Sequence, residues 1–544
     1  MTRATSTTVP TADSIRRLAR ERLGFEQLRT GQLEAIAAAG EGRDVLAVLP
    51  TGAGKTAIYE LVGLLRSGPT VVVSPLIALE DDQLAHLRDA GFSAIVLNST
   101  QSSRGRTAAL ASSRDAEEFV FVSPEQLTNR ETREALRRAK PGLFVVDEAH
   151  LVSQWGQDFR PDYLRLGAQA DALVADVRVA LTATAAPPVR AEIVRRLGLR
   201  DPEVVIGDFD RPEIYLSVYD VDSPLEKRRE IKRAAAELEG SGIVYAATHA
   251  GAQAVRDALE AAGHDVTLYH AGLSNAVRRE AMEAFLDGSA RIVSATVAFG
   301  MGIDKADVRW VVHADPPGSL DAYYQEIGRA GRDGNPAHAR LVYRQADLAT
   351  ARYLAGRSMS ARIVATIAAR LSDIAEGTCI HELADVAGLG ARSVTLALAR
   401  LVDIGAAGWV ADGGIRWTEA MSVAHALEAS ANETAREQEI QASRLEMMRR
   451  YAERSGCRRS FLLTYFGQDY AGPCGACDND HQHPATEVRG DEPFSIGSRV
   501  VNERWGEGTI QRYDRNHVTV LFDEHGYRDL FVPIVLEKHL LRAL

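Results

Sequence analysis

The chain has 544 residues, 46% of them apolar and 25% charged, and this ordinary globular composition excludes a mostly disordered or collagen-like protein. The 63 Lys and Arg residues against 74 Asp and Glu give a formal net charge of −11, which excludes a protein coated in basic charge but not a local basic track that holds nucleic acid. Four cysteines are too few for a disulfide framework at this length, which favours a reducing, cytoplasmic setting. The sequence has no apolar run long enough to predict a membrane span.

Short apolar runs alternate with helical stretches over much of the chain. Residues 1–12 precede this pattern, are rich in Thr and Ser, and predict a disordered lead. The alternation covers residues 13–205 and then residues 206–350, in the βαβ order of a parallel sheet with helices on both faces. We therefore predict an α/β fold with two tandem parallel-sheet lobes and a cleft between them. The predicted strands are 44–49, 70–73, 94–97, 119–122, 143–146 and 177–181 in the first lobe, and 242–245, 266–269, 291–294 and 310–313 in the second.

Three smaller regions follow the two lobes. Residues 351–430 predict a winged helix, because helical patterns flank a Gly-Leu-Gly turn at 388–390 and a hairpin pattern comes next. Residues 431–484 combine a charged helix with a cysteine cluster, which predicts a small helical metal-binding segment. Residues 485–544 carry four short strand signals with Gly turns, which favour a small β-barrel.

The first predicted strand runs directly into a glycine-rich loop, Thr51-Gly52-Ala53-Gly54-Lys55-Thr56, and a helical stretch follows. Glycines allow backbone N–H groups to turn around phosphate oxygens, and a helix N-terminus adds positive charge. Lys55 is then placed to reach the β- and γ-phosphates of a nucleotide, with the Thr56 hydroxyl on Mg²⁺. Leu49 stands where the usual GxxxxGK[ST] pattern has its first Gly. The alternative is a glycine-rich loop with a chance Lys-Thr pair.

Two acidic residues, Asp147 and Glu148, follow the apolar strand 143–146 and open the stretch Asp-Glu-Ala-His. A carboxylate at the end of a buried strand near a phosphate loop is placed to hold Mg²⁺, so we assign this role to Asp147. The adjacent Glu148 is placed to orient or deprotonate the attacking water. The alternative is a helix N-terminus with favourable acidic charges.

Further motifs follow in order, and with them the chain resembles the RecQ family of superfamily 2 DNA helicases. They cover about residues 23–345, and the aromatic-rich stretch after Asp-Glu-Ala-His is characteristic of that family. The resemblance implies two RecA-like lobes, with the ATP-binding lobe at 13–205 and the helicase C-terminal lobe at 206–350. The motifs are LGFEQLRTGQ (23–32), LPTGAGKT (49–56), DEAH (147–150), SQWGQDFRP (153–161), TAT (182–184), YHAGL (269–273), AFGMGIDK (298–305) and QEIGRAGRDG (325–334).

The resemblance also assigns nucleotide contacts at both ends of the motor. Phe25, Arg29 and Gln32 match the family's adenine element, in which an aromatic ring stacks on the base and Gln reads its edge. In the second lobe, Arg332 is our choice for the arginine finger, with Arg329 in support, because hydrolysis needs positive charge on the γ-phosphate from the opposite lobe. Lobe closure and reopening would then move nucleic acid along. The alternative for the two arginines is a surface ion-pair patch.

Candidate nucleic-acid contacts lie in the first lobe and in the predicted winged helix. Ser153, Trp155, Phe159 and Arg160 follow the acidic pair, and an aromatic ring beside a base stacks on it without reading sequence; the alternative is a core aromatic cluster. Other predicted contacts to the phosphate backbone are Ser74 and Pro75 after one strand, with Ser123-Pro124 after another, and Arg392 at the start of a helix. The alternatives are plain strand-end turns and a helical domain that only packs. In addition, Trp409 or Trp417 on the hairpin is a candidate wedge between base pairs.

Three cysteines, Cys457, Cys474 and Cys477, are spaced C-x16-C-x2-C and resemble the zinc segment of the RecQ family. Asp480 stands where the family has its fourth cysteine. Zn²⁺ accepts Cys sulfur, His nitrogen or Asp oxygen, so the fourth ligand is Asp480, His481 or His483, and a weak or empty site with three buried cysteines stays open. Cys379, far away in the sequence, is predicted to be an ordinary core residue.

The order of the accessory regions departs from the family. The predicted winged helix comes before the zinc segment, whereas the family usually has it after. The tail at 485–544 resembles a Tudor- or SH3-like barrel, similar to the tail of UvrD-like helicases that contacts RNA polymerase. Docking of a protein partner, nucleic-acid binding and simple stabilisation are all open for this barrel.

The function that the resemblance implies is an ATP-dependent 3′→5′ DNA helicase that moves along single-stranded DNA and unwinds tailed duplexes in repair or recombination. We expect a cytoplasmic monomer that uses ATP, Mg²⁺ and Zn²⁺. One alternative is a DNA-stimulated ATPase and translocase that unwinds weakly, because the accessory order is unusual. The other is a winged-helix and zinc DNA-binding regulator with an inert motor, which the intact Lys55, Asp147, Glu148 and Arg332 disfavour.

Overall fold

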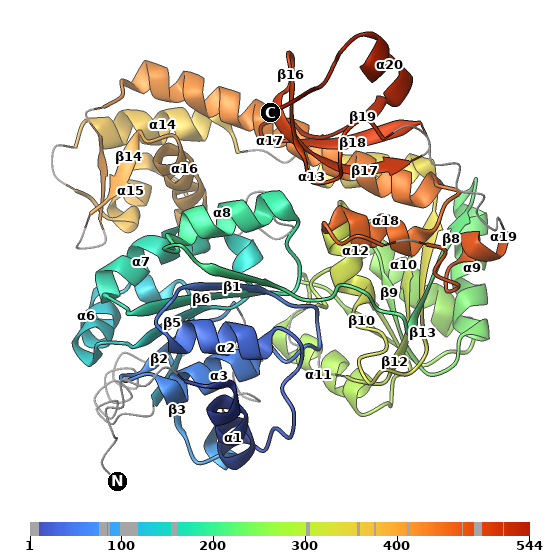
Figure 1. Ribbon diagram of the computed structural model, residues 1–544, viewed down its shortest axis with the longest axis horizontal. Helices are drawn as coiled ribbons and strands as arrows, with labels where there is room; N and C mark the ends of the chain where they lie inside the picture. The colour runs from blue at the N-terminus through green and yellow to red at the C-terminus, as the bar shows by residue number, and fades with distance from the viewer. Residues whose placement is uncertain are drawn as a thin grey trace. The chain divides into compact units, whose positions relative to one another are not determined.

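The computed structural model divides the chain into two compact units. The first unit joins Met1–Gly207 to Ser358–Thr434, and the second joins Asp208–Arg357 to Ala435–Leu544. Each unit therefore contains one lobe and an accessory segment that comes later in the sequence (Figure 1). The structure describes residues 10–75, 84, 87–97, 118–153, 161–300, 305–355, 359–374, 377–410, 414–418, 420–470, 472–482, 492–514 and 516–544.

The lobe of the first unit is built on a seven-stranded parallel sheet with strand order β3-β4-β2-β5-β6-β1-β7. Its central strands are buried throughout and mostly apolar because helices cover both faces. The strands are β1 Val45–Val48, β2 Thr70–Val73, β3 Ser93–Leu97, β4 Glu118–Val122, β5 Leu143–Val146, β6 Val177–Thr182 and β7 Glu203–Ile206. All six predicted strands are present, and only the edge strand β7 is additional.

Helices α1, α2 and α3 pack together on one face of this sheet and share its main apolar core. Figure 1 shows α7 and α8 on the opposite face. The helices are α1 Ala12–Leu23, α2 Gln32–Gly40, α3 Thr56–Leu65, α6 Arg130–Ala139, α7 Leu166–Leu173 and α8 Pro187–Leu197, with short 3-10 turns η1 Gln126–Thr128, η2 Ala149–Val152 and η3 Pro161–Arg165.

The accessory segment of the first unit contains three helices and a two-stranded antiparallel sheet around one apolar core. The elements are α14 Ala361–Ser372, α15 Ile380–Ala387, α16 Ala391–Asp403, β14 Ala407–Trp409 and β15 Ile415–Trp417. The prediction that Cys379 lies in the core is wrong: Cys379 is exposed, and its sulfur accepts a hydrogen bond from the Glu382 N–H as the N-cap of α15. Cysteine takes here the place that Ser or Thr fills at most helix starts.

The lobe of the second unit is a six-stranded parallel sheet with strand order β10-β11-β9-β12-β13-β8. The four predicted strands are present, and β8 and β13 are additional. The strands are β8 Ile214–Asp220, β9 Ser241–Tyr245, β10 Val266–Tyr269, β11 Ile292–Ala295, β12 Val308–His313 and β13 Ala337–Tyr343; the helical elements are α9 Pro224–Glu237, α10 His249–Glu260, α11 Asn275–Leu286, α12 Leu320–Ile327, η4 Gln345–Asp347 and α13 Leu348–Ala355.

The C-terminal part of the second unit begins within the long helix α17, Val423–Glu453, and ends in a five-stranded antiparallel sheet with order β19-β18-β17-β16-β20. The tail therefore contains antiparallel strands and a short helix around its own small core, and its barrel form stays a prediction. The remaining elements are α18 Arg458–Tyr465, α19 Asp478–Gln482, β16 Arg499–Asn502, β17 Gly506–Asp514, β18 His517–Phe522, β19 Gly526–Phe531, α20 Val532–Glu537 and β20 Arg542–Ala543.

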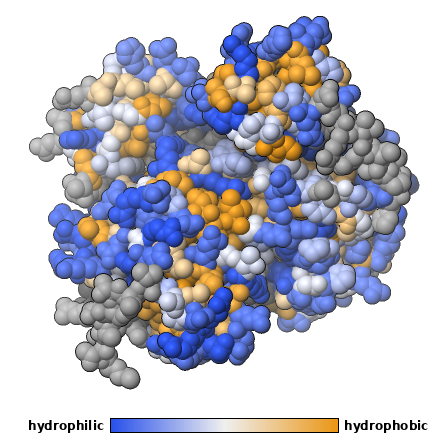
Figure 2. Space-filling view, in the orientation of Figure 1, coloured by the Kyte–Doolittle hydropathy of each residue, from blue (hydrophilic) through white to orange (hydrophobic). Residues whose placement is uncertain are grey.

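Most residues on the face in view in Figure 2 are hydrophilic, with apolar residues scattered among them. This is the normal surface of a globular protein. Within the part of the chain that the structure describes, no helix has the length and apolar character needed to cross a membrane.

Candidate active site and metal centre

The predicted phosphate loop connects β1 to α3 in the first unit. Gly52 and Gly54 have φ angles of 84° and 71°, in the left-handed region that side chains disfavour. The Ala53 N–H donates to the Pro50 carbonyl at 3.0 Å, and the chain then enters α3. The N-terminus of α3 therefore faces the loop, which is the arrangement of an anion site. The Lys55 Nζ donates to the Leu49 carbonyl at 3.3 Å, so the lysine side chain folds back along the loop.

Gln32 braces this loop from α2. Its buried side-chain Nε2 donates to the carbonyls of Ala53 at 2.9 Å and Gly54 at 2.7 Å, while its Oε1 accepts from the Arg29 N–H at 2.7 Å. A Cβ at Gly54 would lie 2.8 Å from the same Nε2, so this contact requires glycine. Phe25 packs half-buried against the core below the loop, and Arg29 is exposed. The structure thus places Gln32 against the loop and joins it to the backbone of Arg29, and the role of all three residues at adenine stays a prediction.

The acidic pair follows β5, which lies between β2 and β6 in the sheet. The Asp147 N–H donates to the Val73 carbonyl at 2.9 Å, which continues the parallel sheet. Burial and the neighbouring Glu148 raise the pKa of Asp147 to about 6, although the Lys55 ammonium lowers it. A carboxylate that is costly to keep charged gains from a cation, so this oxygen ligand fits Mg²⁺. The Tyr163 hydroxyl donates to the Asp147 carbonyl at 3.3 Å and holds the turn from η3.

Glu148 and His150 link the acidic pair to the end of β6. Glu148 has a φ of 49°, and one of its carboxylate oxygens lies 3.3 Å from His150 Nδ1. The same His150 nitrogen lies 3.0 Å from the hydroxyl of Thr182, which belongs to the predicted Thr-Ala-Thr motif. The two motifs are thus joined inside the lobe.

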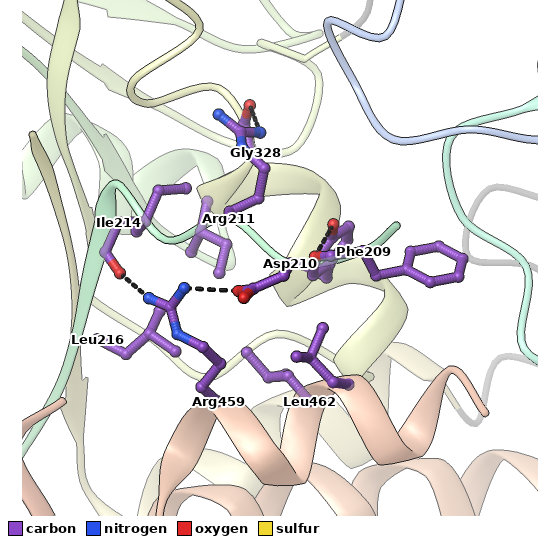
Figure 3. A pocket seen from close by; sticks show the side chains of 11 residues that line it. Phe209, Asp210, Arg211, Ile214, Leu216, Gly328, Arg459 and Leu462 are labelled. Atoms are coloured by element: carbon purple, nitrogen blue, oxygen red, sulfur yellow. Dashed lines mark hydrogen bonds and ion pairs between the residues drawn. The ribbon is translucent and has the colours of Figure 1, made fainter. Parts of the chain in front are cut away.

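The candidate arginines lie in the second unit, after α12. Arg329 is buried, and Arg332 is half-buried. The Arg211 side chain donates to the carbonyls of Gly328 at 3.1 Å and Ala330 at 2.9 Å, so it grips the turn on both sides of Arg329 (Figure 3). Because Lys55 and Asp147 belong to the first unit and Arg332 to the second, the role of Arg332 as arginine finger stays a prediction.

Figure 3 shows the small cavity, about 20 Å³, that lies next to this turn in the second unit. Its lining is mostly apolar, and Arg459 of α18 crosses it to reach Asp210 at 2.6 Å and the Ile214 carbonyl at 2.7 Å. The Tyr324 hydroxyl donates to the Phe209 carbonyl at 2.6 Å on the same wall. The cavity is therefore a packing space between α18 and α12, too small for a nucleotide.

The predicted metal ligands come together in the second unit. The sulfur atoms of Cys457, Cys474 and Cys477 and a carboxylate oxygen of Asp480 all lie within 4.8 Å of one another. Hydrogen bonds from the thiols of Cys474 and Cys477 lower the pKa of Cys457. Asp480 Oδ2 also accepts from the N–H groups of Cys474 at 2.8 Å and Gly475 at 2.9 Å, which orients this carboxylate. Three thiols and one carboxylate are a donor set that fits tetrahedral Zn²⁺.

The two other candidates for the fourth ligand, and part of the predicted DNA contacts, lie beyond what the structure describes. The side chains of His481 and His483 are outside the described residues, as are Trp155, Phe159 and Arg160. Asp480 is thus the fourth donor that the described structure brings to the cysteines.

The described candidates for nucleic-acid contact are placed differently from one another. Arg392 is exposed in the first turn of α16, whereas Ser74 and Ser153 are buried. The Ser153 hydroxyl donates to Glu192 on α8. Pro75 is half-buried after β2, and Ser123 is buried after β4.

Both hairpin tryptophans pack against neighbours. The Arg165 guanidinium lies 3.5 Å from the ring centre of Trp409, and Trp417 Nε1 donates to the Met421 carbonyl at 3.0 Å. The contacts of Glu192, Arg211 and Arg165 were not predicted, because each joins residues far apart in the sequence and no local pattern marks them.

Three family models match the chain. The DEAD/DEAH box helicase model matches residues 29–192, the helicase conserved C-terminal domain matches residues 226–334, and the RecQ zinc-binding model matches residues 418–481. The first two cover most of the two parallel-sheet lobes, and the third covers the cysteine cluster.

Similar curated proteins carry helicase names. The ATP-dependent DNA helicase RecQ of Pasteurella multocida is 39% identical over 328 residues, which are 60% of this chain and 51% of that protein. The RecQ of Bacillus subtilis is 37% identical over 338 residues, 62% of this chain and 57% of that protein. The probable ATP-dependent DNA helicase RecS of Bacillus subtilis is 31% identical over 456 residues, 82% of this chain and 87% of that protein. The chain thus spans about half the length of the first of these and most of the last.

A similar solved structure is that of the Mycobacterium smegmatis helicase Lhr bound to single-stranded DNA and AMP-PNP. It has a TM-score of 0.50 and 21% identity, and the match covers 76% of this chain and 60% of that one. At this identity the likeness concerns the fold alone, and it agrees with two parallel-sheet lobes of the RecA type.

Proposed function

Since the chain belongs to the RecQ family of superfamily 2 helicases, we propose that it couples ATP hydrolysis to movement along single-stranded DNA and to unwinding of tailed duplexes. The direction is 3′→5′ and the setting is DNA repair or recombination in the cytoplasm, as the family implies. The observation that carries the proposal is the meeting of the Thr51–Thr56 loop with the partly buried carboxylate of Asp147 beside Lys55.

The residues of the first unit have different roles at the nucleotide. Lys55 exchanges its bond to the Leu49 carbonyl for the β- and γ-phosphates, and the loop N–H groups cradle the phosphate oxygens. Thr56 and Asp147 would hold Mg²⁺, which supplies charge neutralisation on those oxygens when bound. Glu148 orients the attacking water and accepts its proton. Phe25, Arg29 and Gln32 form the adenine pocket.

Arg332, supported by Arg329, completes the site from the second unit as the transition state forms. An arginine finger is worth ~10³–10⁵ in rate, about 4–7 kcal/mol. Arg211 supports this role, because its grip on both sides of Arg329 keeps the turn from collapsing when the arginines are pulled toward a phosphate. DNA contacts come from Ser74, Pro75 and the aromatic residues Trp155 and Phe159.

The accessory segments bind metal and DNA. Cys457, Cys474, Cys477 and Asp480 hold Zn²⁺ as a structural ion that joins α18 to α19. The segment at 359–434 acts as a winged helix, with Arg392 of α16 on the DNA backbone. The antiparallel sheet of the tail is a Tudor- or SH3-like module that docks a protein partner. The enzyme acts as a monomer.

A second candidate function, a translocase that unwinds weakly, is favoured by one observation. Neither Trp409 nor Trp417 projects freely from the hairpin, since Arg165 covers the first and the Met421 carbonyl binds the second. A hairpin whose aromatic residues are committed to packing is a poor wedge between base pairs. Strand displacement on a 3′-tailed duplex, measured beside translocation on single-stranded DNA, distinguishes the two functions.

The proposal is tested by ATP turnover with and without single-stranded DNA. The wild-type protein is expected to show strong DNA stimulation, and Lys55→Ala is expected to lose turnover by at least ~10³-fold while still binding DNA, because the γ-phosphate loses its cation. Lys538→Ala, at an exposed lysine after α20, is the matched control and keeps full turnover. Retained turnover in Lys55→Ala would reject the phosphate site.

A further inference from the structure

Two contacts join the accessory segment at 359–434 to the lobe of the first unit. One is a buried ion pair in which Arg196 of α8 makes two bonds to the Asp403 carboxylate, at 2.7 and 3.2 Å. The other is the stack of Arg165, the last residue of η3, on Trp409 of β14. Both contacts start from lobe elements that pack against the turn after the acidic pair.

The ion pair continues to the turn after the acidic pair. Arg196 Nε also donates to Glu192 Oε1 at 2.5 Å, and the second oxygen of Glu192 accepts from the Ser153 hydroxyl. Ser153 is fully buried and ends η2, the turn that begins directly after Glu148. A chain of side chains therefore runs from Asp403 through Arg196 and Glu192 to the catalytic turn.

Asp403 stands at a position that helix electrostatics disfavours. It is the last residue of α16, where the helix C-terminus carries partial negative charge. The Arg196 guanidinium compensates for it. Burial opposes the charge on Arg196, but Asp403 and Glu192 outweigh burial and raise its pKa. The Arg196 guanidinium thus stays charged, with both side chains of the pair mostly excluded from water.

The stack reaches the same catalytic turn from its other side. Arg165 is 5% exposed and lies at the end of η3. Tyr163 of the same η3 turn is fully buried and donates to the Asp147 carbonyl at 3.3 Å. A shift of η3 would therefore move the backbone that carries the Mg²⁺ carboxylate.

We propose that Asp403 and Trp409 are positioning residues for ATP hydrolysis: through Arg196–Glu192–Ser153 and through η3, the segment at 359–434 holds the turn that carries Asp147 and Glu148. The segment is then a working part of the ATPase lobe in addition to its DNA-binding role. The inference rests on the proposed function, because it concerns the same site. Its consequence is that a substitution in this segment changes kcat for ATP while the nucleotide pocket keeps its affinity.

The test measures kcat and KM for ATP with saturating single-stranded DNA in the full chain. Asp403→Asn and Trp409→Ala are each expected to lower kcat about tenfold with little change in KM, as the loss of a group that orients catalytic ligands does. Asp403→Glu and Trp409→Phe keep the charge and the ring, so they are expected to retain most of kcat. Asp385→Asn, an exposed aspartate of the same segment, is the control and keeps full activity.

Folding is followed by circular dichroism and thermal unfolding. Arg196→Lys keeps the charge but loses the two-pronged bond to Asp403, so it provides a milder variant in case Asp403→Asn does not fold. A roughly threefold loss of kcat, about half of the tenfold effect on a logarithmic scale, is expected. Wild-type kcat in folded Asp403→Asn, Trp409→Ala or Arg196→Lys would overturn the inference. A wild-type protein without DNA-stimulated turnover would instead reject the proposed function itself.

Discussion

The two units attach their accessory segments to their lobes by different chemistry. In the first unit, the described side-chain contacts that join 359–434 to the lobe are the Arg196–Asp403 pair and the Arg165–Trp409 stack. In the second unit, the C-terminal segment adds backbone bonds: the Leu216 N–H donates to the Ala476 carbonyl at 3.1 Å, at the outer edge of strand β8. One attachment depends on charge and an aromatic ring, and the other extends a sheet.

The second attachment is also the more deeply buried. The Asp321 carboxylate of α12 accepts from Arg444 of α17 at 2.9 Å and from the Tyr465 hydroxyl of α18 at 2.5 Å. Tyr465 in turn stacks on Tyr527 of the tail at 5.2 Å between ring centres. The zinc segment and tail therefore form one packed body with the second lobe. This difference predicts that the first attachment responds to single charges and the second to the integrity of the metal cluster.

Removing the metal should have the largest effect on stability. Chelation, or Cys477→Ser, is expected to destabilise the second unit by about 5 kcal/mol, less than the ~10–16 kcal/mol of zinc-dependent peptides because Arg444 and Tyr465 still hold the segment. Amide hydrogen exchange measures it: the Leu216 and Val218 amides, which donate to Ala476 and Asp478, should lose protection. Cys379→Ser in the first unit is the control, since an N-cap Ser is at least as good. Unchanged protection of β8 after metal removal would refute a metal-dependent attachment.

Breaking the buried carboxylate contact of the second unit should rank next. Asp321→Ala leaves the Arg444 guanidinium buried and without its carboxylate, and it is expected to cost ~3–5 kcal/mol in the free energy of unfolding. Asp403→Ala in the first unit is expected to cost less, because the Asp403 side chain is 16% exposed against 9% for Asp321. Urea unfolding of both variants gives the comparison. An equal or reversed order would show that the two attachments do not differ in burial energy.

The contrast also explains which elements could be predicted from the sequence. Strands β1, β2, β4, β5 and β6 are rich in apolar residues because both sheet faces are covered, and their pattern is visible without a structure. Strand β13 was not predicted; it mixes His338 and Arg340 with apolar residues, and Arg340 is buried against Glu230 and Glu237 of α9 and the Tyr219 ring. Strands β7 and β8 were not predicted either; both are edge strands that mix polar with apolar residues.

The candidate site divides in the same way. The phosphate loop and the acidic pair are each a short continuous stretch of sequence, so the residue types of each stretch alone predicted phosphate and Mg²⁺ chemistry. The resemblance to the RecQ zinc segment also made Asp480 a candidate zinc ligand, and the structure places it in the cluster. Arg196 and Asp403 are 207 residues apart, and the bracing of the loop by Gln32 is likewise a tertiary contact. Neither contact leaves a local signal, because a charged or polar residue on a helix has many ordinary reasons to be there.

The smallest predicted effect concerns the energetic cost of the partly buried Asp147 carboxylate. Because burial and Glu148 raise the pKa of Asp147 to about 6 from its ordinary value near 4, the folded state binds this proton more tightly than the unfolded state. The free energy of unfolding of the nucleotide-free protein should then fall as the pH rises from about 4 to about 6, and the loss should persist above pH 6. Asp147→Asn removes the charge, so it is expected to raise the melting temperature at pH 8 by a few degrees while abolishing Mg²⁺-dependent turnover.

Thermal unfolding of the wild type and Asp147→Asn at pH 5 and pH 8, without nucleotide, measures this effect. Asp171→Asn, at an exposed aspartate of α7 in the same lobe, is the control and should not stabilise the protein at pH 8. If Asp147→Asn melts at or below the wild-type temperature at pH 8, the carboxylate is not costly in the empty site. The Asp147 carboxylate would then carry no free-energy cost in the empty site, and the contacts through Asp403 and Trp409 would have no unfavourable charge to hold in place.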